Sequence, residues 1–260
     1  MAPAPPGPEP MRPCKIVWIA SMPRVGSMWS YNVCRALVAE AGFRVEPAEA
    51  LRTNEEALEA ARRGLRSVDP AVRTVVKTHL LVDPTTRASL FVVPLRDPRD
   101  ALVSAQRFLH LPDFDAALSY TTDSLRTVEH YENPAFGDRI LHLDYRQIVD
   151  APDAAIRAMA AHLGIAAGQE AVEALAARFA RARVGETLGR LAEDSARALM
   201  TFNPDGSPRL FDRETGFQTG HVSDYREGGW RELLTTAQLV AIDRTLGPWL
   251  ARRGYPRTLP

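Results

Sequence analysis

The sequence predicts a single α/β domain in which a parallel β-sheet is flanked by helices. The chain has 260 residues, 45% of them hydrophobic, which is enough to bury one sizeable core. Four short apolar runs contain β-branched residues and are typical of buried strands. Stretches with helical spacing separate these runs, and strands that alternate with helices favour a parallel sheet. Ligands of such sheets bind beyond the carboxyl ends of the strands, so the residues after each strand are the first candidates for chemistry.

The boundaries of the expected elements follow from this periodicity. The expected strands are residues 15–20, 74–79, 90–95 and 139–143. The expected helices are residues 28–41, 54–64, 98–108, 114–131, 152–163, 170–182 and 236–246. Residues 191–225 contain the turn-forming residues Asn203, Pro204 and Gly206 and have no periodicity. We expect a long surface loop there, of the type that forms a lid, binds a ligand or is disordered.

Charge and cysteine content exclude several classes of protein. Lys and Arg together number 32, as do Asp and Glu, so no global field attracts nucleic acid or a membrane, and neither is expected as a partner. Cys14 and Cys34 are too few for a disulfide framework, which favours a reducing, cytoplasmic compartment. Residues 1–13 carry six prolines and no apolar run, and we expect a flexible tail before a domain that spans 14–260. No run of 18 apolar residues predicts a bilayer span.

The first candidate site follows the first strand, where the segment 21–29 leads directly into a helix. A turn of this kind presents free backbone N–H groups and the positive end of the helix dipole. Gly26 would let a phosphate approach, Ser27 adds a hydroxyl and Arg24 supplies a cation. Alternatively, this is an ordinary strand-to-helix turn with Ser27 as N-cap. It is not a Walker A loop, because the second glycine and the Lys-Ser/Thr pair are missing.

Two further strands end in polar residues. Lys77 and His79 are two apart on a strand and point to the same side, which would place a base beside a cation. Arg96 follows the third strand, and Ser104 lies eight residues later, two turns along a helix that Pro98 begins. A guanidinium and a hydroxyl at this spacing can hold a phosphate. For the first pair, the alternative is a strand-end lysine beside a capping histidine. For the second, the alternative is that the charged residues of the segment 96–100 pair with one another at the start of the helix.

Tyr145 follows the fourth strand and is by itself more typical of a half-buried packing residue than of a ligand contact. His221, in the aperiodic segment, is a weaker candidate for phosphate binding. The other histidines show no partner pattern. No G-x-G-x-x-G motif for a dinucleotide is present.

In this order, the segments resemble the cytosolic-type sulfotransferase family, and the resemblance covers residues 16–255. The family transfers a sulfuryl group from 3′-phosphoadenosine 5′-phosphosulfate (PAPS) to a hydroxyl or amine, leaving 3′-phosphoadenosine 5′-phosphate (PAP). The resemblance implies a P-loop-like sulfotransferase fold, PAPS as cofactor without a metal, and a small-molecule acceptor.

The resemblance also implies a role for each matched residue. Residues 23–29 are similar to the 5′-phosphosulfate loop Pro-Lys-Ser-Gly-Thr-Thr-Trp, in which Trp29 takes the position that stacks on adenine. His79 matches the catalytic base and Lys77 the residue that touches the sulfuryl group. Arg96 and Ser104 match the pair that holds the 3′-phosphate, and Tyr145 matches a tyrosine close to the adenine. The expected site residues are therefore, in the catalytic group, His79, Lys77 and Arg24, and in the cofactor-binding group, Arg24, Val25, Gly26, Ser27, Met28, Trp29, Arg96, Ser104, Tyr145 and Arg226.

Three departures from the family pattern distinguish this chain. Arg24 replaces a lysine, and a guanidinium stabilises charge but does not hand over a proton. Val25 and Met28 remove two hydroxyls from the loop. The family's Arg-Lys-Gly segment is replaced by residues 223–225, Ser-Asp-Tyr, so Arg226 and His221 are the expected substitutes at the 3′-phosphate. In the family, a dimer motif follows a Gly-x-Trp segment, which corresponds here to Gly228-Gly229-Trp230. That dimer motif is eroded over residues 231–240, and a homodimer is kept as an expectation.

Three other functions remain as alternatives. A small-molecule kinase of the P-loop type would need a triphosphate cradle and a metal-holding carboxylate, which the sequence does not show. A nucleotide-binding protein without turnover is compatible with the altered loop, and a helical interaction module is disfavoured by the β-rich runs. For the acceptor we expect a phenol or a lipid-like alcohol rather than a sugar. Its expected pocket is apolar and aromatic, formed by Phe108, His110, Phe114, Tyr120 and residues 200–217, although these residues could instead pack the core.

Overall fold

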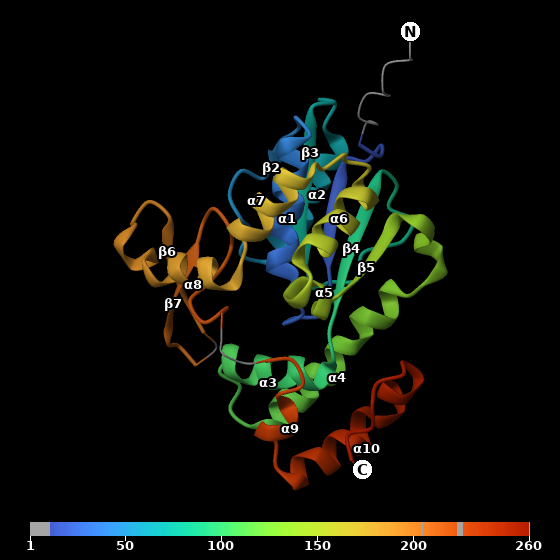
Figure 1. Ribbon diagram of the computed structural model, residues 1–260, viewed down its shortest axis with the longest axis vertical. Coiled ribbons are helices and arrows are strands. Elements are labelled where there is room, and N and C mark those ends of the chain that lie inside the picture. The colour runs from blue at the N-terminus through green and yellow to red at the C-terminus, as the bar shows by residue number, and fades with distance from the viewer. Residues whose placement is uncertain (1–10, 204, 223–225, 260) are drawn as a thin grey trace.

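A five-stranded parallel sheet forms the centre of the molecule, with the strand order β2-β3-β1-β4-β5 (Figure 1). The computed structural model describes residues 11–203, 205–222 and 226–259. The strands are β1 (Ile16–Ala20), β2 (Arg44–Glu46), β3 (Val72–Thr78), β4 (Ser89–Leu95) and β5 (Ile140–Asp144). β1 lies between β3 and β4, so the strand order reverses at β1. The carboxyl edge beside such a reversal is where ligands of open α/β sheets bind.

Helices cover both faces of this sheet, as expected for parallel strands. Within β1, Val17 and Ile19 pack with α1 and α6, whereas Ile16 and Trp18 face the core beneath α2. The helices from the N-terminus to the middle of the chain are α1 (Ser27–Glu40), α2 (Asn54–Arg66), α3 (Pro98–Phe108), α4 (Phe114–Tyr131), α5 (Tyr145–Asp150), α6 (Pro152–Leu163), α7 (Gln169–Arg178) and α8 (Arg181–Gly189). Short 3-10 helices, η1 (Pro134–Arg139) and η2 (Leu191–Glu193), and then α9 (Trp230–Leu233) and α10 (Thr236–Arg252), complete the set.

A second group of helices lies beneath the carboxyl ends of the strands, where Figure 1 shows α3, α4, α9 and α10. Their shared core includes Leu102, Trp230 and Leu246. Met22 and Val25, from the loop after β1, are buried in the same core. This loop is therefore fixed on the side away from the sheet, which gives the candidate site a rigid base.

The sequence-based prediction of the fold class is confirmed, and each expected strand and helix is present. Most boundaries lie within two residues of those predicted, but the expected helix 236–246 continues to Arg252. The short elements β2, α5, α8 and α9 were not predicted. Strands of three residues and helices of four to nine residues give too few periods for a pattern to be recognised. The expected helix 170–182 ends at Arg178, and a new helix begins at Arg181.

The prediction of a long surface loop over residues 191–225 is wrong. Strands β6 (Ala198–Phe202) and β7 (Pro208–Asp212) form an antiparallel hairpin in this region. Gly206 has a φ of 80°, which a glycine adopts without strain, and the side chain of Asn203 bonds to that of Ser207. The turn signal was therefore correct, but the flanking strands are too short and irregular in hydropathy for the sequence to reveal them.

The N-terminal boundary of the packed chain lies earlier than residue 14. Met11 is buried, the backbone N–H of Arg12 donates to the carbonyl of Leu163, and the Arg12 guanidinium pairs with Asp138 at 2.7 Å. Residues 11–13, expected to belong to the flexible tail, are therefore held against α6 and η1. Residues 1–10 of the expected tail lie outside the described residues.

Two general features bear on the sequence-based expectations. Among residues 11–203, 205–222 and 226–259, no helix has both the length and the apolar character needed to cross a membrane. Cys14 and Cys34 are buried as free thiols.

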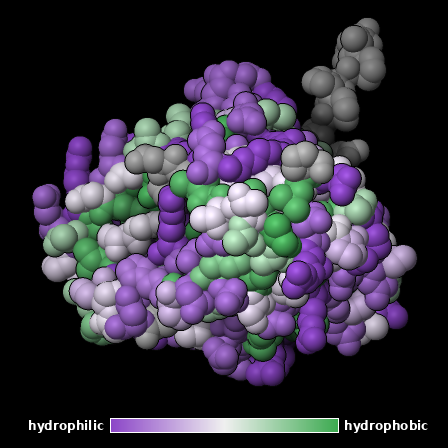
Figure 2. All heavy atoms as spheres, turned by 90° about the horizontal axis from the view of Figure 1, so that it is seen from below, coloured by the Kyte–Doolittle hydropathy of each residue, from purple (hydrophilic) through white to green (hydrophobic). Residues whose placement is uncertain are grey.

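Seen from below (Figure 2), the end of the molecule shows hydrophobic side chains among hydrophilic ones. Leu233 and Val240 are exposed hydrophobic residues of α9 and α10, within the segment where a dimer motif was expected, and the homodimer stays a prediction.

Arg99 is the residue that ties α3 to the C-terminal end of the chain. Its fully buried guanidinium pairs with Asp97 at 2.6 Å, donates to the carbonyl of Pro256 at 2.8 Å and lies 4.1 Å from the ring centre of Trp230. Replacing Arg99 by Leu leaves the buried Asp97 carboxylate without its partner. We expect R99L to lower the free energy of unfolding by roughly 3–5 kcal/mol in urea denaturation.

Arg66, whose side chain is exposed at the end of α2, provides the matched control. R66L should change the free energy of unfolding by less than about 1 kcal/mol, because exposed ion pairs contribute little. Equal effects of the two substitutions would show that the buried Arg99 network does not hold the helix layer.

Candidate functional site

The β1–α1 loop, residues 21–26, has the backbone of an anion-binding turn. Arg24 and Gly26 have φ angles of 67° and 89°, in the left-handed region. A side chain at Gly26 would bring Cβ to 2.9 Å from Ile148 Cδ1 and 3.2 Å from Tyr145 Cδ2. Gly26 is also the N-cap of α1, and a glycine supplies no side-chain acceptor. The first N–H groups of α1 are therefore left without a side-chain cap at the end of a helix dipole that favours an anion.

The end of β3 supplies a base whose tautomer is fixed. His79 Nδ1 lies 2.7 Å from the backbone carbonyl of Ser21, which can only accept, so Nδ1 carries the proton. Nε2 therefore keeps its lone pair, and Lys77 Nζ lies 3.0 Å from it. Asn54 Oδ1 accepts from the backbone N–H of His79 at 2.9 Å and holds the strand end in place. The prediction that Lys77 and His79 emerge together at the sheet edge is confirmed.

The site is electropositive, and its cations shift one another's pKa. Burial lowers the pKa of His79 to about 3, with further lowering by the Lys77 and Arg24 charges. Burial, followed by the Arg24 charge, lowers the pKa of Lys77 to about 8. Burial, followed by the Arg96 charge, lowers the pKa of Arg24 to about 10. At neutral pH, His79 is thus uncharged while Arg24 remains charged and Lys77 is predominantly so.

Arg24, Ser104 and Arg96 form one connected group. Arg24 Nε donates to Ser104 Oγ at 3.1 Å, and Arg96 Nη1 donates to the backbone carbonyl of Arg24 at 3.1 Å. The Arg96 guanidinium also lies 4.1 Å from the ring centre of Tyr145, which contacts the Gly26 position. The ends of β1, β4 and β5 therefore bring these sequence-predicted residues together on one side of the β1–α1 loop.

Two acidic residues border this group, and sequence analysis did not single them out. Glu227 Oε2 lies 3.0 Å from Arg96 Nε, and Asp100 accepts from the backbone N–H of Gly228 at 2.9 Å. Burial raises the pKa of Glu227 to about 7, an effect that the Arg96 charge opposes and that Asp100 reinforces. The Arg96 guanidinium thus meets a carboxyl group of its own chain at the point where an anion was expected.

A second cluster surrounds Phe108, at the end of α3. The guanidinium carbons of Arg24 and Arg209 each lie 3.9 Å from the Phe108 ring centre, and the His221 ring stacks on it with 4.6 Å between centres. His221 Nδ1 accepts from the backbone N–H of Gln218, and burial lowers the pKa of His221 well below its ordinary value. The hairpin residue Arg209 also donates to the carbonyl of Phe108. Sequence analysis gave no signal for Arg209.

Other expected cofactor residues lie further from this group. Val25 is buried in the core beneath the sheet edge, and Met28 meets the Gly216 turn, whose added Cβ would lie 2.5 Å from Met28 Cε. Ser27 is buried at the first position of α1, and Trp29 is half-buried against the core around α1. Arg226 is exposed and paired with Glu232. Residues 223–225, the expected counterpart of the Arg-Lys-Gly segment, lie outside the described residues.

Only some of the expected acceptor residues lie near Arg24. Phe108 lies beside Arg24, and Arg24 is close enough to Tyr120 to oppose the rise that burial causes in the pKa of that phenol. His110 instead pairs with Asp205 at an exposed position, and Phe114 packs against the core beneath the sheet edge. The first two residues therefore stay candidates for an acceptor pocket.

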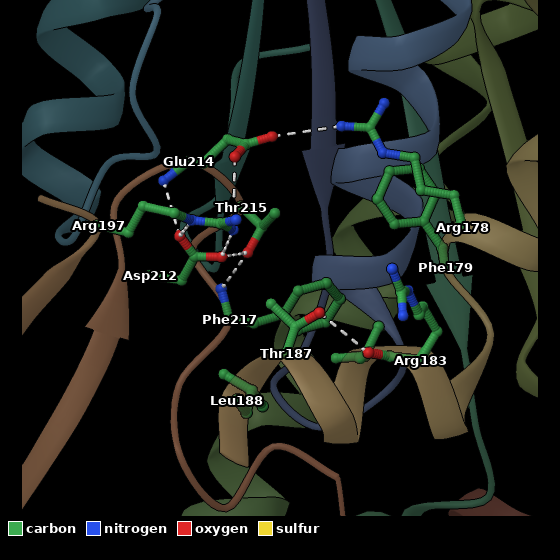
Figure 3. Close-up of a pocket in the computed structure, with 11 residues that line it drawn as sticks. Arg178, Phe179, Arg183, Thr187, Leu188, Arg197, Asp212, Glu214, Thr215 and Phe217 are labelled. Carbon is green, nitrogen blue, oxygen red and sulfur yellow. Dashed lines mark hydrogen bonds and ion pairs between the residues drawn. The ribbon is translucent and has the colours of Figure 1, made fainter. Parts of the chain in front are cut away.

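A cavity of about 190 Å³ lies elsewhere, between α7, α8 and the turn that follows β7 (Figure 3). Its polar groups pair with one another: Arg197 pairs with Asp212 and Glu214, and Thr215 Oγ1 donates to Asp212 at 2.7 Å. None of the expected catalytic or cofactor-binding residues lines it, whereas Asp212, Glu214, Thr215 and Phe217 belong to the segment 200–217 that was expected at the acceptor pocket. Within the described part of the chain, no group of three or more His, Cys, Asp or Glu side chains is arranged to hold a metal ion.

Solved structures of other proteins match the fold of this chain, whereas comparisons of its sequence found no match. No protein-family model and no curated protein sequence matches the chain. The structure of retinol dehydratase in complex with androsterone and inactive cofactor PAP has a TM-score of 0.63 and 17% identity, covering 93% of this chain and 82% of that one. Mouse sulfotransferase SULT7A1 complexed with PAP has a TM-score of 0.61 and 18% identity, covering 92% of this chain and 85% of that one. The chain has the sulfotransferase fold. In this sulfotransferase fold, the polar edge described above is formed by the ends of β1, β3, β4 and β5.

Gly26 permits a direct test of the anion-binding turn. G26A adds a Cβ at a left-handed φ and against Ile148 and Tyr145, whereas G42A adds one at a φ of 87° with nothing within 4 Å. Both variants should lose roughly 1–2 kcal/mol of stability from backbone strain. Only G26A should also weaken binding of inorganic phosphate, by at least about tenfold in calorimetric titration, because Tyr145 and the loop must move apart. Equal phosphate affinities in the two variants would contradict this assignment of the loop.

Proposed function

We propose that this protein is a PAPS-dependent sulfotransferase that transfers a sulfuryl group to a hydroxyl, or an amine, of a small molecule. The observation that carries the proposal is one sheet edge at which a neutral imidazole with a fixed lone pair meets three cations. His79 is the imidazole, and Arg24, Lys77 and Arg96 are the cations. The fold agrees, because it is shared with proteins crystallised with PAP.

The residues at this edge fit the anionic donor PAPS. The uncapped backbone N–H groups at the N-terminus of α1 are donors for a 5′-phosphosulfate. Ser21 Oγ is buried and has no hydrogen-bond partner among the described residues, as expected of a polar atom beside a polar ligand. PAPS supplies an activated sulfuryl group. Arg96, Ser104 and Tyr145 would hold its nucleotide part, and Trp29 would stack on the adenine.

The reaction then needs positioning and charge stabilisation more than covalent chemistry by the protein. The acceptor oxygen forms a bond to sulfur as the bond between sulfur and the bridging phosphate oxygen breaks in line. The acceptor proton passes to His79 Nε2, and the negative charge that develops on the bridging oxygen remains on the nucleotide product. Lys77 and Arg24 stabilise the sulfuryl and bridging oxygens through N–H donors.

The resting contact between Lys77 and His79 links base activity to donor binding. Lys77 Nζ lies at the His79 lone pair, and the Lys77 and Arg24 charges lower the His79 pKa. With an anionic donor bound, the Lys77 ammonium would donate to the sulfuryl oxygens instead, and the donor's negative charge would offset the charges of Lys77 and Arg24. His79 thereby regains a free lone pair and a higher pKa, which a general base near neutral pH requires.

Removal of the base gives the central test. H79A should reduce turnover by roughly 10²- to 10⁴-fold, the usual contribution of one general base, and leave PAP binding nearly unchanged. The assay incubates protein with labelled PAPS and a panel of phenols, alcohols, sugars and amines and detects sulfated product by mass. R96A should instead weaken nucleotide binding in a calorimetric titration.

His142, exposed on β5, provides the control for H79A. H142A should retain activity within about twofold. Unchanged turnover in H79A would remove His79 as the base. PAP binding without transfer to any acceptor would indicate a non-catalytic nucleotide-binding protein, and phosphoryl transfer from ATP would indicate a kinase.

The pH dependence follows from Lys77. Its pKa of about 8 means that its charge is present below about pH 8 and lost as pH rises through that value. With an aliphatic alcohol as acceptor, kcat/KM should fall above about pH 8, as the charge of Lys77 is lost. In K77M, kcat/KM should be lower throughout and lose the alkaline fall. Persistence of the fall in K77M would assign it to another group.

For the acceptor, we propose a phenol or an alcohol with an apolar body. Phe108 packs against Arg24, and Tyr120 lies close enough to Arg24 for its pKa to respond to that charge, which places aromatic side chains near the cations. We also propose a cytoplasmic location, which is compatible with the free thiols of Cys14 and Cys34. The same panel of acceptors decides between an aromatic-lined site and a sugar site.

A further inference from the structure

Glu227 lies where the proposed function would place an anion of the nucleotide. The Glu227 carboxylate is 3.0 Å from Arg96 Nε, and the two side chains are 19% and 4% exposed. Arg96 is held from two other directions, by the backbone carbonyl of Arg24 and by the face of the Tyr145 ring. A ligand anion that approaches the Nε side of Arg96 therefore meets Glu227 first.

A second carboxyl group strengthens this arrangement. Asp100 is 1% exposed, lies on α3 one turn beyond Arg96, and accepts from the backbone N–H of Gly228, next to Glu227. Asp100 also raises the pKa of Glu227, as a neighbouring acidic side chain does. The segment that carries Glu227 is thus fixed to α3, and the two carboxyl groups offset the charge of Arg96.

This arrangement has opposite consequences for two nucleotides. A 3′-phosphate must displace the Glu227 carboxylate from Arg96 and then lie near Asp100, and like charges in a partly buried site repel. A 3′-hydroxyl carries no charge and can donate to a carboxylate, as ribose hydroxyls do in other nucleotide sites. The chain also lacks the Arg-Lys-Gly segment that would supply further cations here, and Arg226 pairs with Glu232 at an exposed position.

We infer that Glu227 is a specificity-determining residue that lowers the preference of this site for a 3′-phosphate over a 3′-hydroxyl on an adenosine 5′-phosphate. This inference rests on the proposed function, because it concerns the same nucleotide site. Glu227 touches the residue that would contact the ligand, and its effect falls on nucleotide choice rather than on the reacting atoms.

Calorimetric titration of two nucleotides tests the inference. PAP and adenosine 5′-monophosphate (AMP) are titrated against the full chain, and selectivity is the ratio of the AMP Kd to the PAP Kd. The titrations are run at about pH 8, above the Glu227 pKa of about 7, so that this carboxyl group is ionised in the wild-type chain. In E227Q the amide keeps the size of the side chain without that charge, so the ratio should rise by at least about tenfold. The rise should come from tighter PAP binding, with the AMP Kd changed by less than about threefold.

E170Q is the control, since Glu170 is an exposed acid in the first turn of α7 and belongs to no group of the proposed nucleotide site. It should leave the ratio within about twofold of the wild-type value. E227A repeats the test without an amide, and thermal unfolding of each variant confirms that it is folded. If E227Q does not fold, E227A alone carries the comparison.

The outcomes separate the inference from the proposed function. An unchanged ratio in E227Q and E227A, with both nucleotides still bound, overturns the inference and leaves the sulfotransferase proposal intact. Weaker PAP binding in these variants also overturns it, because Glu227 would then support the 3′-phosphate site. If neither PAP nor AMP binds the wild-type chain or any variant, the nucleotide site itself is absent and both proposals fail.

Discussion

Mutual repulsion among Arg24, Lys77 and Arg96 is the constraint on which the candidate site depends. The structure holds Arg24 against Ser104 and Phe108. It holds Arg96 against a backbone carbonyl, the ring of Tyr145 and the carboxyl group of Glu227. These groups compensate only part of the charge of the three cations, as the lowered pKa values of Arg24 and Lys77 show. An edge with this composition is most stable when an anion joins it, so affinity for an anionic ligand is built into the fold.

The sequence predicted the polar ends of the strands because parallel strands end at a common edge. Lys77, His79 and Arg96 each follow a buried apolar run, and the alternation of strands and helices was sufficient to bring them together. The contact between His79 and the carbonyl of Ser21 was beyond such an argument, since it depends on how neighbouring strands are aligned. That contact decides which nitrogen of the imidazole can accept a proton.

Residues that reach the site from distant segments could not be predicted, because their positions depend on long-range packing rather than on local pattern. Arg209 arrives from a hairpin that the sequence suggested only through its turn, and Glu227 from a segment anchored on α3 through Asp100. For the motif of residues 23–29, the sequence also could not show which way each side chain points. Val25 belongs to the hydrophobic core below the edge, and Met28 packs against the Gly216 turn.

The same charges that attract a ligand also link ligand binding to the state of His79. While Lys77 donates to His79, the imidazole has neither a free lone pair nor a pKa suited to accepting a proton. In the proposed reaction, an acceptor alcohol that enters first would therefore find no base, whereas a donor that enters first would engage Lys77 and release His79 Nε2. Proton transfer in that proposal is thus conditional on the donor being bound, with no movement of the backbone required.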